Sequence, residues 1–246
     1  MEIINDLLEI DNLKIYQNDD WFKFSLESVL LPNFVTLNQR CKNILDLCTG
    51  NAPIPLILST KTKANIVGIE IQKDVYELAE KSVKINKLEN RIKIINDNLI
   101  NLKEYYAGDH FDVVTVNPPY FPNINESLKN MDIHKSIARH EIYTNLDDIV
   151  KISSYLLKNG GYIALVHQTN RFFDVTDILK KYHFSINKVQ FIYPKENKDS
   201  NLFMIEAIKS GNSGVKFLKP LYVHNEDGSY KKEIMDIFKN EREGDL

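Results

Sequence analysis

The sequence is poor in the features that mark secreted, membrane-spanning or metal-binding proteins. It has two cysteines in 246 residues, Cys41 and Cys48, too few and too close together for a disulfide framework or a zinc knuckle. No apolar run approaches the roughly 18 residues of a membrane helix, and acids stand near the N-terminus where a secretory signal carries bases. The histidines show no metal-ligand spacing. We therefore expect a cytosolic protein with reduced thiols, no membrane contact and no metal.

Repeats, low-complexity tracts and flexible linkers are also missing, and positive charge is not in excess. The net charge of −3 argues against a protein that coats nucleic acid by bulk attraction. The charge is uneven, however, because residues 180–239 carry eleven lysines against seven acids, whereas residues 1–123 carry thirteen bases against seventeen acids. The C-terminal third is therefore the expected face for a polyanion, with a merely solvated lysine surface as the alternative.

The apolar pattern alternates between buried strands and amphipathic helices, which is typical of an α/β domain with a parallel sheet. Strands are expected over 43–48, 65–71, 91–95, 111–116 and 162–167, and helices over 53–60, 73–86, 146–157 and 173–182, the helix at 146–157 being closed by a turn at 159–161. Two late strands, 184–193 and 202–208, suit an antiparallel pair at the edge of the sheet. The pattern predicts one seven-stranded, mostly parallel sheet with a terminal antiparallel strand pair.

Polar residues follow the carboxyl ends of three strands, where open parallel sheets bind ligands. Gly50 lies in the turn 46–52 and lets the backbone approach a ligand, although a purely structural turn explains a lone glycine equally well. Glu70 comes 20 residues after Gly50, the separation expected of a carboxylate that accepts both ribose hydroxyls of an adenosine cofactor. Asp97 ends the third strand, either as an acceptor for an adenine amine or as a helix cap.

The tetrapeptide Asn117-Pro118-Pro119-Tyr120 follows the fourth strand and matches the needs of an amine whose lone pair is delocalised. If the Asn117 side-chain oxygen and the Pro118 carbonyl accept from the amine, its nitrogen becomes more sp³-like and its lone pair turns toward a sulfonium methyl. Such bonds strengthen in the transition state. Tyr120 would stack on the base that carries the amine. The motif therefore predicts methyl transfer to a planar amine, with a simple strand-ending turn as the alternative.

The sequence resembles the class I S-adenosylmethionine-dependent methyltransferases, specifically the bacterial tRNA adenine-N6 methyltransferases that modify nucleotide 37 of valine tRNA. Beyond the tetrapeptide, the resemblance lies in residues 24–31, 137–141, 194–209 and 220–228. It implies a Rossmann-like fold, S-adenosylmethionine as cofactor, and methyl transfer to N6 of adenine 37 in the tRNA anticodon loop. A loop base is cheaper to expose than a base inside a duplex. We expect a monomer with tRNA as its partner.

The resemblance also assigns residues to the site, with the segment 25–28 closing over the methionine end of the cofactor. The cofactor residues are Ser28, Asp46, Thr49, Gly50, Glu70, Ile71, Asp97, Asn98 and Asn117, and the catalytic residues are Asn117, Pro118 and Tyr120. Cys48 and Ala52 depart from the Gly-x-Gly-x-Gly pattern of the wider family, which leaves the backbone path of this turn open.

Four residues are assigned to RNA. Arg139 and His140 would meet the tRNA backbone, with a buried ion pair to Glu141 as the alternative. Lys195 and Lys198 belong to a candidate phosphate track that also includes lysines 180, 181, 188, 209, 216 and 219. We divide the chain into an N-terminal segment closing over the cofactor (1–42), a methyltransferase domain (43–210) and a C-terminal extension of that same domain (211–246).

Three other functions compete with this interpretation. A DNA adenine methyltransferase shares the tetrapeptide but usually carries a target-recognition insertion, for which the connections are too short. A protein-glutamine N5-methyltransferase acting on a release factor or ribosomal protein adds a helical domain before the first strand, and only 42 residues precede Asn43. The third alternative is a non-catalytic protein that binds S-adenosylmethionine or RNA, against which the intact tetrapeptide argues.

Overall fold

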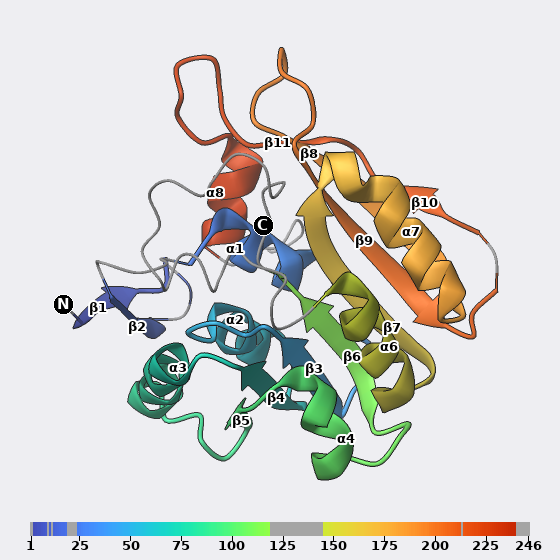
Figure 1. The fold of residues 1–246 in the computed structure, drawn as a ribbon. Coiled ribbons are helices and arrows are strands. Elements are labelled where there is room, and N and C mark those ends of the chain that lie inside the picture. Colours follow the sequence, from blue (N-terminus) through green and yellow to red (C-terminus); the bar gives the residue numbers. More distant parts are fainter. Residues whose placement is uncertain are drawn as a thin grey trace, which may run out of the picture.

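The computed structural model describes residues 2–8, 10, 12–18, 24–118, 145–212 and 214–239, and its centre is a nine-stranded sheet (Figure 1). The strand order is β10-β8-β9-β7-β6-β3-β4-β5, with β11 also pairing with β8. The strands are β3 (Asn43–Leu47), β4 (Asn65–Glu70), β5 (Ile92–Asn96), β6 (Phe111–Val116), β7 (Leu157–Gln168), β8 (Phe184–Tyr193), β9 (Leu202–Lys209), β10 (Lys216–Phe217) and β11 (Leu221–Tyr222). All seven long strands were predicted, with β7 alone differing by more than one residue at its start, and β10 and β11 are two-residue additions along β8.

Helices cover both faces of this sheet. They are α1 (Leu26–Phe34), α2 (Pro53–Lys61), α3 (Lys73–Ile85), α4 (Leu102–Tyr105), α6 (Leu146–Leu156), α7 (Phe172–Lys181) and α8 (Lys232–Phe238), with 3₁₀ turns η1 (Leu99–Asn101) and η2 (Thr169–Arg171). Because side chains alternate along a strand, Val113 of β6 packs on the side of α1, α2, α3 and α8, whereas Val114 packs on the side of α4, α6 and α7. In the described parts of the chain, none of the helices has the length and hydropathy needed to cross a bilayer.

The strand directions decide which loops share an edge of the sheet. Strands β3 to β7 run parallel to one another, and β9 runs antiparallel to both β7 and β8. The predicted antiparallel pair is therefore confirmed. Since β8 has the same direction as β7, the loop 194–201 leaves the sheet at the edge where the parallel strands have their carboxyl ends.

Strand β7 begins earlier than the sequence predicts. It starts at Leu157, directly after α6, and includes the residues expected to form a turn at 159–161. The register with β6 shifts there, from Phe111 opposite Leu157 to Val113 opposite Tyr162. Gly160 has a φ of +79°, which a glycine adopts without strain. The extra residues therefore form a bulge in the strand instead of ending it.

The N-terminal residues form a hairpin of β1 (Glu2–Asp6) and β2 (Lys14–Asn18), separate from the main sheet. The hairpin contacts α3, where the Tyr16 N–H donates to Ser82 Oγ at 2.9 Å. One hydrophobic cluster unites Leu7 beside the hairpin, Val29 of α1 and Ile234 of α8. Residues from both ends of the chain therefore pack into the same core as the sheet.

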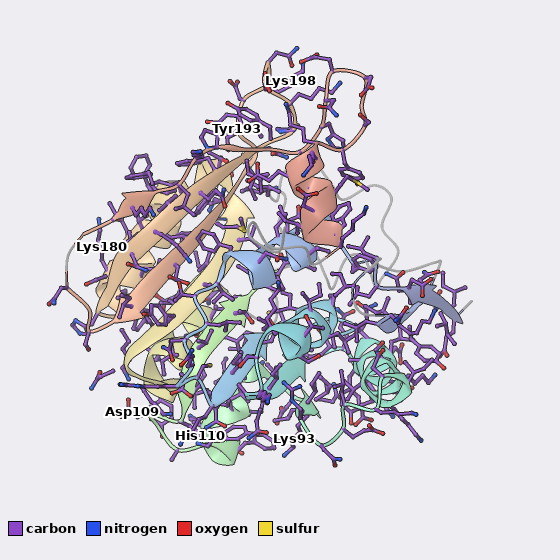
Figure 2. The ribbon with its side chains drawn as sticks, turned by 180° about the vertical axis from the view of Figure 1, so that it is seen from behind. Lys93, Asp109, His110, Lys180, Tyr193 and Lys198 are labelled. Atoms are coloured by element: carbon purple, nitrogen blue, oxygen red, sulfur yellow. The ribbon has the colours of Figure 1, made fainter. Side chains whose placement is uncertain are left out.

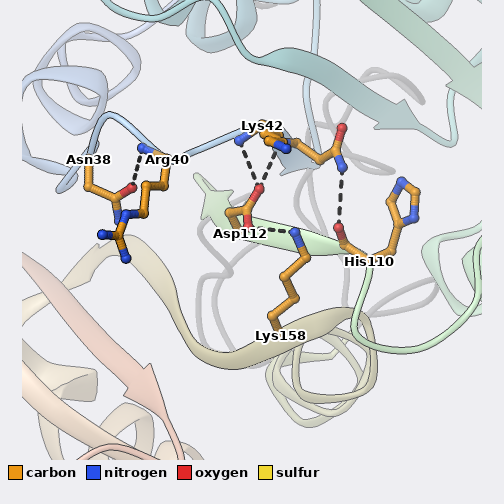
Figure 3. Close-up of polar contacts among 7 residues, drawn as sticks. Asn38, Arg40, Lys42, His110, Asp112 and Lys158 are labelled. Carbon is orange, nitrogen blue, oxygen red and sulfur yellow. Dashed lines mark hydrogen bonds and ion pairs between the residues drawn. The ribbon is translucent and has the colours of Figure 1, made fainter.

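The amino ends of the strands are tied together by Asp112 (Figure 3). Its Oδ2 accepts from the N–H groups of Lys42 and Asn43, both at 2.9 Å, and its Oδ1 accepts from Lys158 Nζ at 2.6 Å. Burial alone would raise the pKa of Asp112, but the Lys158 ammonium and the two amides outweigh it and lower that pKa. An open cavity of about 400 Å³ lies at this edge, with Lys93 and His110 in its lining (Figure 2), away from the strand ends predicted to bind a ligand.

Candidate functional site

The turn after β3 is fastened to the end of β4 by Glu70. The Gly50 N–H donates to Glu70 Oε2 at 3.0 Å, and the Gln72 N–H donates to Oε1 at 2.9 Å. The Thr49 N–H also donates to the carbonyl of Ile69 at 3.0 Å. Burial raises the pKa of Glu70, and the backbone N–H groups act in the opposite direction. A buried carboxyl group and a glycine turn thus meet at the carboxyl edge of the sheet.

The turn has left-handed backbone at three alternate residues. The φ angles are +57° at Cys48, +58° at Gly50 and +71° at Ala52. Cys48 and Ala52 therefore adopt the conformation that glycine would adopt in a Gly-x-Gly-x-Gly turn, at a cost on the order of 1–3 kcal/mol each. A Cβ built on Gly50 would meet no atom within 4 Å. The outer side of the turn is therefore open, and local strain is concentrated beside that opening.

Asp46 supports this turn from the side of the sheet. It is fully buried; its Oδ2 accepts from Thr49 Oγ1 and its Oδ1 from Thr115 Oγ1, both at 2.6 Å. Asp46 and Thr115 are paired across the β3–β6 ladder. The sequence interpretation missed Thr115, although it is the one hydroxyl residue in β6. Asp46 therefore holds the turn to β6 through two hydroxyl groups, and its role toward the cofactor stays a prediction.

We predict that the stability of the protein depends on pH through Asp46. Burial raises its pKa from 3.8 to about 7, against the opposing effect of the Thr115 and Thr49 hydroxyls. Because the folded state then binds the proton more tightly than the unfolded state, this group lowers the free energy of unfolding as pH rises from about 4 to about 7. In Asp46→Asn, the free energy of unfolding relative to wild type should therefore rise across that window, as measured by urea denaturation.

Asp112→Asn provides a control of opposite sign. The pKa of Asp112 is lowered, so its carboxylate stabilises wild type above the unfolded-state pKa, and that stabilisation is lost as pH falls. This variant should therefore lose stability relative to wild type as pH rises from acid values. A difference between Asp46→Asn and wild type that stays constant from pH 4 to pH 7 would show that Asp46 titrates normally.

Asp97 and Asn98 lie at the end of β5, beside the end of β4. Asp97 Oδ1 accepts from Asn101 Nδ2 at 2.8 Å and its Oδ2 accepts from Tyr105 Oη at 2.8 Å, and these bonds, led by the Tyr105 hydroxyl, lower the pKa of Asp97. Asn98 Oδ1 accepts from the Ile100 N–H at 3.0 Å and caps η1. The residue that caps η1 is thus Asn98 and not Asp97, and a role of either residue toward adenine stays a prediction.

A second asparagine joins the ends of β4 and β5. Asn96 Nδ2 donates to the carbonyl of Glu70 at 2.9 Å and to that of Ile71 at 3.1 Å. Since Glu70 and Asn96 are also paired across the two strands, Ile71 and Asp97 leave the sheet side by side. The predicted cofactor residues of these two strands therefore share one edge.

Asn117 lies at the same edge and contacts the first turn of α1. Its Nδ2 donates to Ser28 Oγ at 3.1 Å and to Ser25 Oγ at 3.5 Å. Pro118 is buried. Val116 is paired with Leu47, so Asn117 and the Cys48 turn are neighbours. The structure thus brings together Asn117 and the Ser25–Ser28 segment, whereas Tyr120, Arg139 and His140 lie outside the described residues.

The lysines predicted to follow RNA phosphates do not form one surface. In the loop 194–201, Lys198 is exposed and lies in the projecting part of Figure 2, whereas Lys195 is half-buried and its Nζ donates to the carbonyl of Glu226 at 2.8 Å. Lys188 and Lys209 have side chains only 17% and 15% exposed. The prediction is wrong for these two residues. Lys188 is paired with the buried Glu206, and Lys209 is paired with Asp109 at the opposite edge of the sheet.

A mostly parallel sheet closed by an antiparallel strand pair, with a glycine turn and an acidic residue at its carboxyl edge, defines a Rossmann-like methyltransferase fold. A solved structure of a predicted O-methyltransferase from Agrobacterium tumefaciens superposes with a TM-score of 0.69 at 18% identity, covering 87% of this chain and 95% of that chain. A geranyl diphosphate methyltransferase solved in complex with SAM gives 0.56 at 9% identity, covering 74% and 84%. The family model described as "Methyltransferase domain" matches residues 38–240, and the chain belongs to that family.

Curated relatives share one name, tRNA1(Val) (adenine(37)-N6)-methyltransferase. The relative from Parabacteroides distasonis is 27% identical over 82% of this chain and 83% of its own length. That from Aliivibrio salmonicida is 26% identical over 87% of each chain. That from Phocaeicola vulgatus is 25% identical over 96% of this chain and 84% of its own. The similarity therefore extends over most of each protein.

Proposed function

We propose that this protein transfers a methyl group from S-adenosylmethionine to N6 of adenine 37 in valine tRNA. The observation that carries the proposal is the name shared by curated relatives that match most of the chain. The site adds the chemistry: Asn117 lies at the carboxyl edge of the sheet, one strand from the Gly50 turn and two from Glu70. The described part of the site therefore offers an amide acceptor for an amine beside the candidate cofactor residues.

The residues at the edge fit an adenosine cofactor. Glu70 is buried at the end of β4, where its carboxylate accepts from the N–H groups of Gly50 and Gln72. Ribose hydroxyls would donate to the same carboxylate, next to the open side of the Gly50 turn. S-adenosylmethionine, when bound, supplies an electrophilic methyl group on a sulfonium sulfur. Ser28, on the first turn of α1, would close the site from the other side.

The chain's own contribution to the reaction is to orient and polarise the amine. Asn117 Nδ2 donates to Ser28 Oγ, and Oδ1 would accept from the amine together with the carbonyl of Pro118. Accepting from N6 withdraws its lone pair from the ring and makes the nitrogen a better nucleophile. Because these bonds strengthen as positive charge develops on nitrogen, they favour the transition state over the bound substrate.

The test is a comparison of methyl acceptors. Purified protein is incubated with methyl-labelled S-adenosylmethionine and a valine tRNA transcript, the same transcript with guanine at position 37, an adenine-containing DNA duplex, or a release factor. We expect label only in the first transcript, and N6-methyladenosine after nucleoside digestion and mass spectrometry. Label in the release factor would support the protein-glutamine alternative, and binding of tRNA without transfer would support the non-catalytic one.

Glu70→Ala should weaken binding of S-adenosylmethionine by roughly 10-fold or more, because ribose hydroxyls held in a buried site would lose their acceptor. Isothermal titration calorimetry measures the effect directly. Glu70→Gln is the matched control: it keeps one acceptor oxygen, so its affinity should lie between those of wild type and Glu70→Ala. An affinity of Glu70→Ala equal to that of wild type would remove Glu70 from the cofactor site.

A further inference from the structure

An aromatic side chain that the sequence interpretation did not single out stands exposed at the carboxyl edge of the sheet. Phe173, on the first turn of α7, is 76% exposed, more than the other exposed large hydrophobic residues described. Its neighbour Phe172 turns inward, with ring centroids 5.0 Å from Phe203 and 5.5 Å from Phe191. The ring of Phe173 meets that of Phe172 edge-on at 5.7 Å and 79°. The core thus supports one side of a ring whose remaining surface faces solvent.

The position of Phe173 follows from the strand order. Val116 of β6 is paired with Leu165 of β7, and Asn117 comes directly after Val116. Strand β7 continues only to Gln168 before η2 and α7 begin. Phe173 therefore leaves the sheet at the same edge as Asn117, from the neighbouring strand.

The surface around Phe173 continues into the lysine loop 194–201. The Thr169 N–H donates to the carbonyl of Asn201 at 3.0 Å, and Thr169 Oγ1 lies 3.1 Å from Ser200 Oγ. On the other side, Arg171 Nε is paired with Asp174 Oδ2 at 2.5 Å across the start of α7. The turn that leads into Phe173 therefore carries the Arg171 guanidinium and is bonded to the loop of Lys195 and Lys198.

We propose that Phe173 is a stacking platform for an unpaired base of the RNA substrate, with Arg171 and the loop 194–201 beside it. The proposal rests on the proposed function. Proteins recognise single-stranded RNA by stacking its bases on exposed aromatic rings and by placing cations along its backbone. An anticodon loop has several unpaired bases, so one of them would stack on Phe173 while adenine 37 enters the site at Asn117.

The test compares Phe173→Ala with Phe217→Ala. Phe217 is also strongly exposed, at 61%, but lies on β10, opposite Val189 in the interior of β8. We expect Phe173→Ala to raise the Kd for an anticodon stem-loop by roughly 5- to 100-fold. The Kd of Phe217→Ala for the stem-loop should stay within about twofold of the wild-type value, because Phe173 is still present for stacking. Phe173→Trp, which keeps a stacking surface, should restore binding. Affinity for S-adenosylmethionine and the melting temperature should not change in Phe173→Ala. A merely structural role of Phe173 would instead lower one or both of them.

A second measurement finds the base concerned. Each loop nucleotide other than 37 is made abasic in turn, and we expect one position at which wild type loses affinity and Phe173→Ala does not. An unchanged Kd for Phe173→Ala, with or without a change in oligomeric state, overturns the platform while leaving tRNA methylation by wild type intact. A wild-type protein that binds no tRNA would refute both the platform and the proposed function.

Discussion

Asn117→Ala should lower the turnover number for tRNA methylation by roughly 10²-fold or more, because an oriented acceptor aimed at developing charge is among the largest single contributions to catalysis. The affinity for S-adenosylmethionine should change little, since Asn117 Oδ1 is proposed to accept from the amine of the substrate. Single-turnover rates at saturating tRNA and cofactor measure the effect. Turnover equal to wild type would remove Asn117 from the mechanism.

Two variants separate the role of Asn117 Oδ1 as an acceptor from the role of the hydrogen bond between Asn117 Nδ2 and Ser28. Ser28→Ala removes the 3.1 Å bond that fixes the amide but leaves the amide itself, so we expect a smaller loss of turnover than for Asn117→Ala. Asn117→Asp keeps an acceptor oxygen and loses the donor to Ser28, and it should also retain more activity than Asn117→Ala. If both matched Asn117→Ala, the orientation of α1, and not the acceptor, would control the rate.

Glu206→Ala should lower the free energy of unfolding by about 3–5 kcal/mol, because it breaks a buried ion pair and leaves several donors without an acceptor. Glu206 is fully buried in β9; its Oε2 accepts from the Thr36 N–H at 2.6 Å and lies 3.4 Å from Lys188 Nζ. Its Oε1 accepts from Thr36 Oγ1 and from Asn187 Nδ2, both at 2.9 Å. Equilibrium urea denaturation at neutral pH measures the loss.

The residues around Glu206, which are Thr36, Asn187 and Lys188, also fix the C-terminal end of α1. Lys188 Nζ donates to the carbonyl of Phe34 at 2.6 Å, and burial lowers the pKa of Lys188 against the opposing effect of Glu206. Glu196→Ala is the matched control, since Glu196 pairs with Lys231 at 2.5 Å but is itself 62% exposed. It should change the free energy of unfolding by less than about 1 kcal/mol. Equal effects of the two variants would contradict a special role for burial.

The central part of the fold could be predicted because its sequence signals are strong. In β3, β4 and β6, runs of buried β-branched and aliphatic residues end at polar turns, and the structure places these strands within one residue of the predicted bounds. The hairpin of β1 and β2 was not predicted, because β1 has no buried residue and β2 has only two. The early start of β7 was missed because Gly160, which normally signals a turn, here permits a bulge.

For the site, the sequence predicted which residues lie at the strand ends, but it did not predict most of the contacts that their side chains make. Spacing brought Glu70 and the Gly50 turn together correctly, because carboxyl ends of neighbouring parallel strands must share an edge. It could not reveal that Asp46 binds Thr115, since that pairing depends on the register between β3 and β6. Phe173 escaped notice because its sequence neighbourhood reads as an ordinary amphipathic helix, and only the fold shows which of two adjacent phenylalanines faces solvent.

The most direct measurement of the central claim is a structure of the protein with an inert analogue of S-adenosylmethionine and the anticodon stem-loop of valine tRNA. The account predicts that N6 of adenine 37 lies within roughly 2.7–3.2 Å of Asn117 Oδ1, with the ribose of the analogue at Glu70. Adenine 37 bound elsewhere, or with N6 away from Asn117, would contradict it.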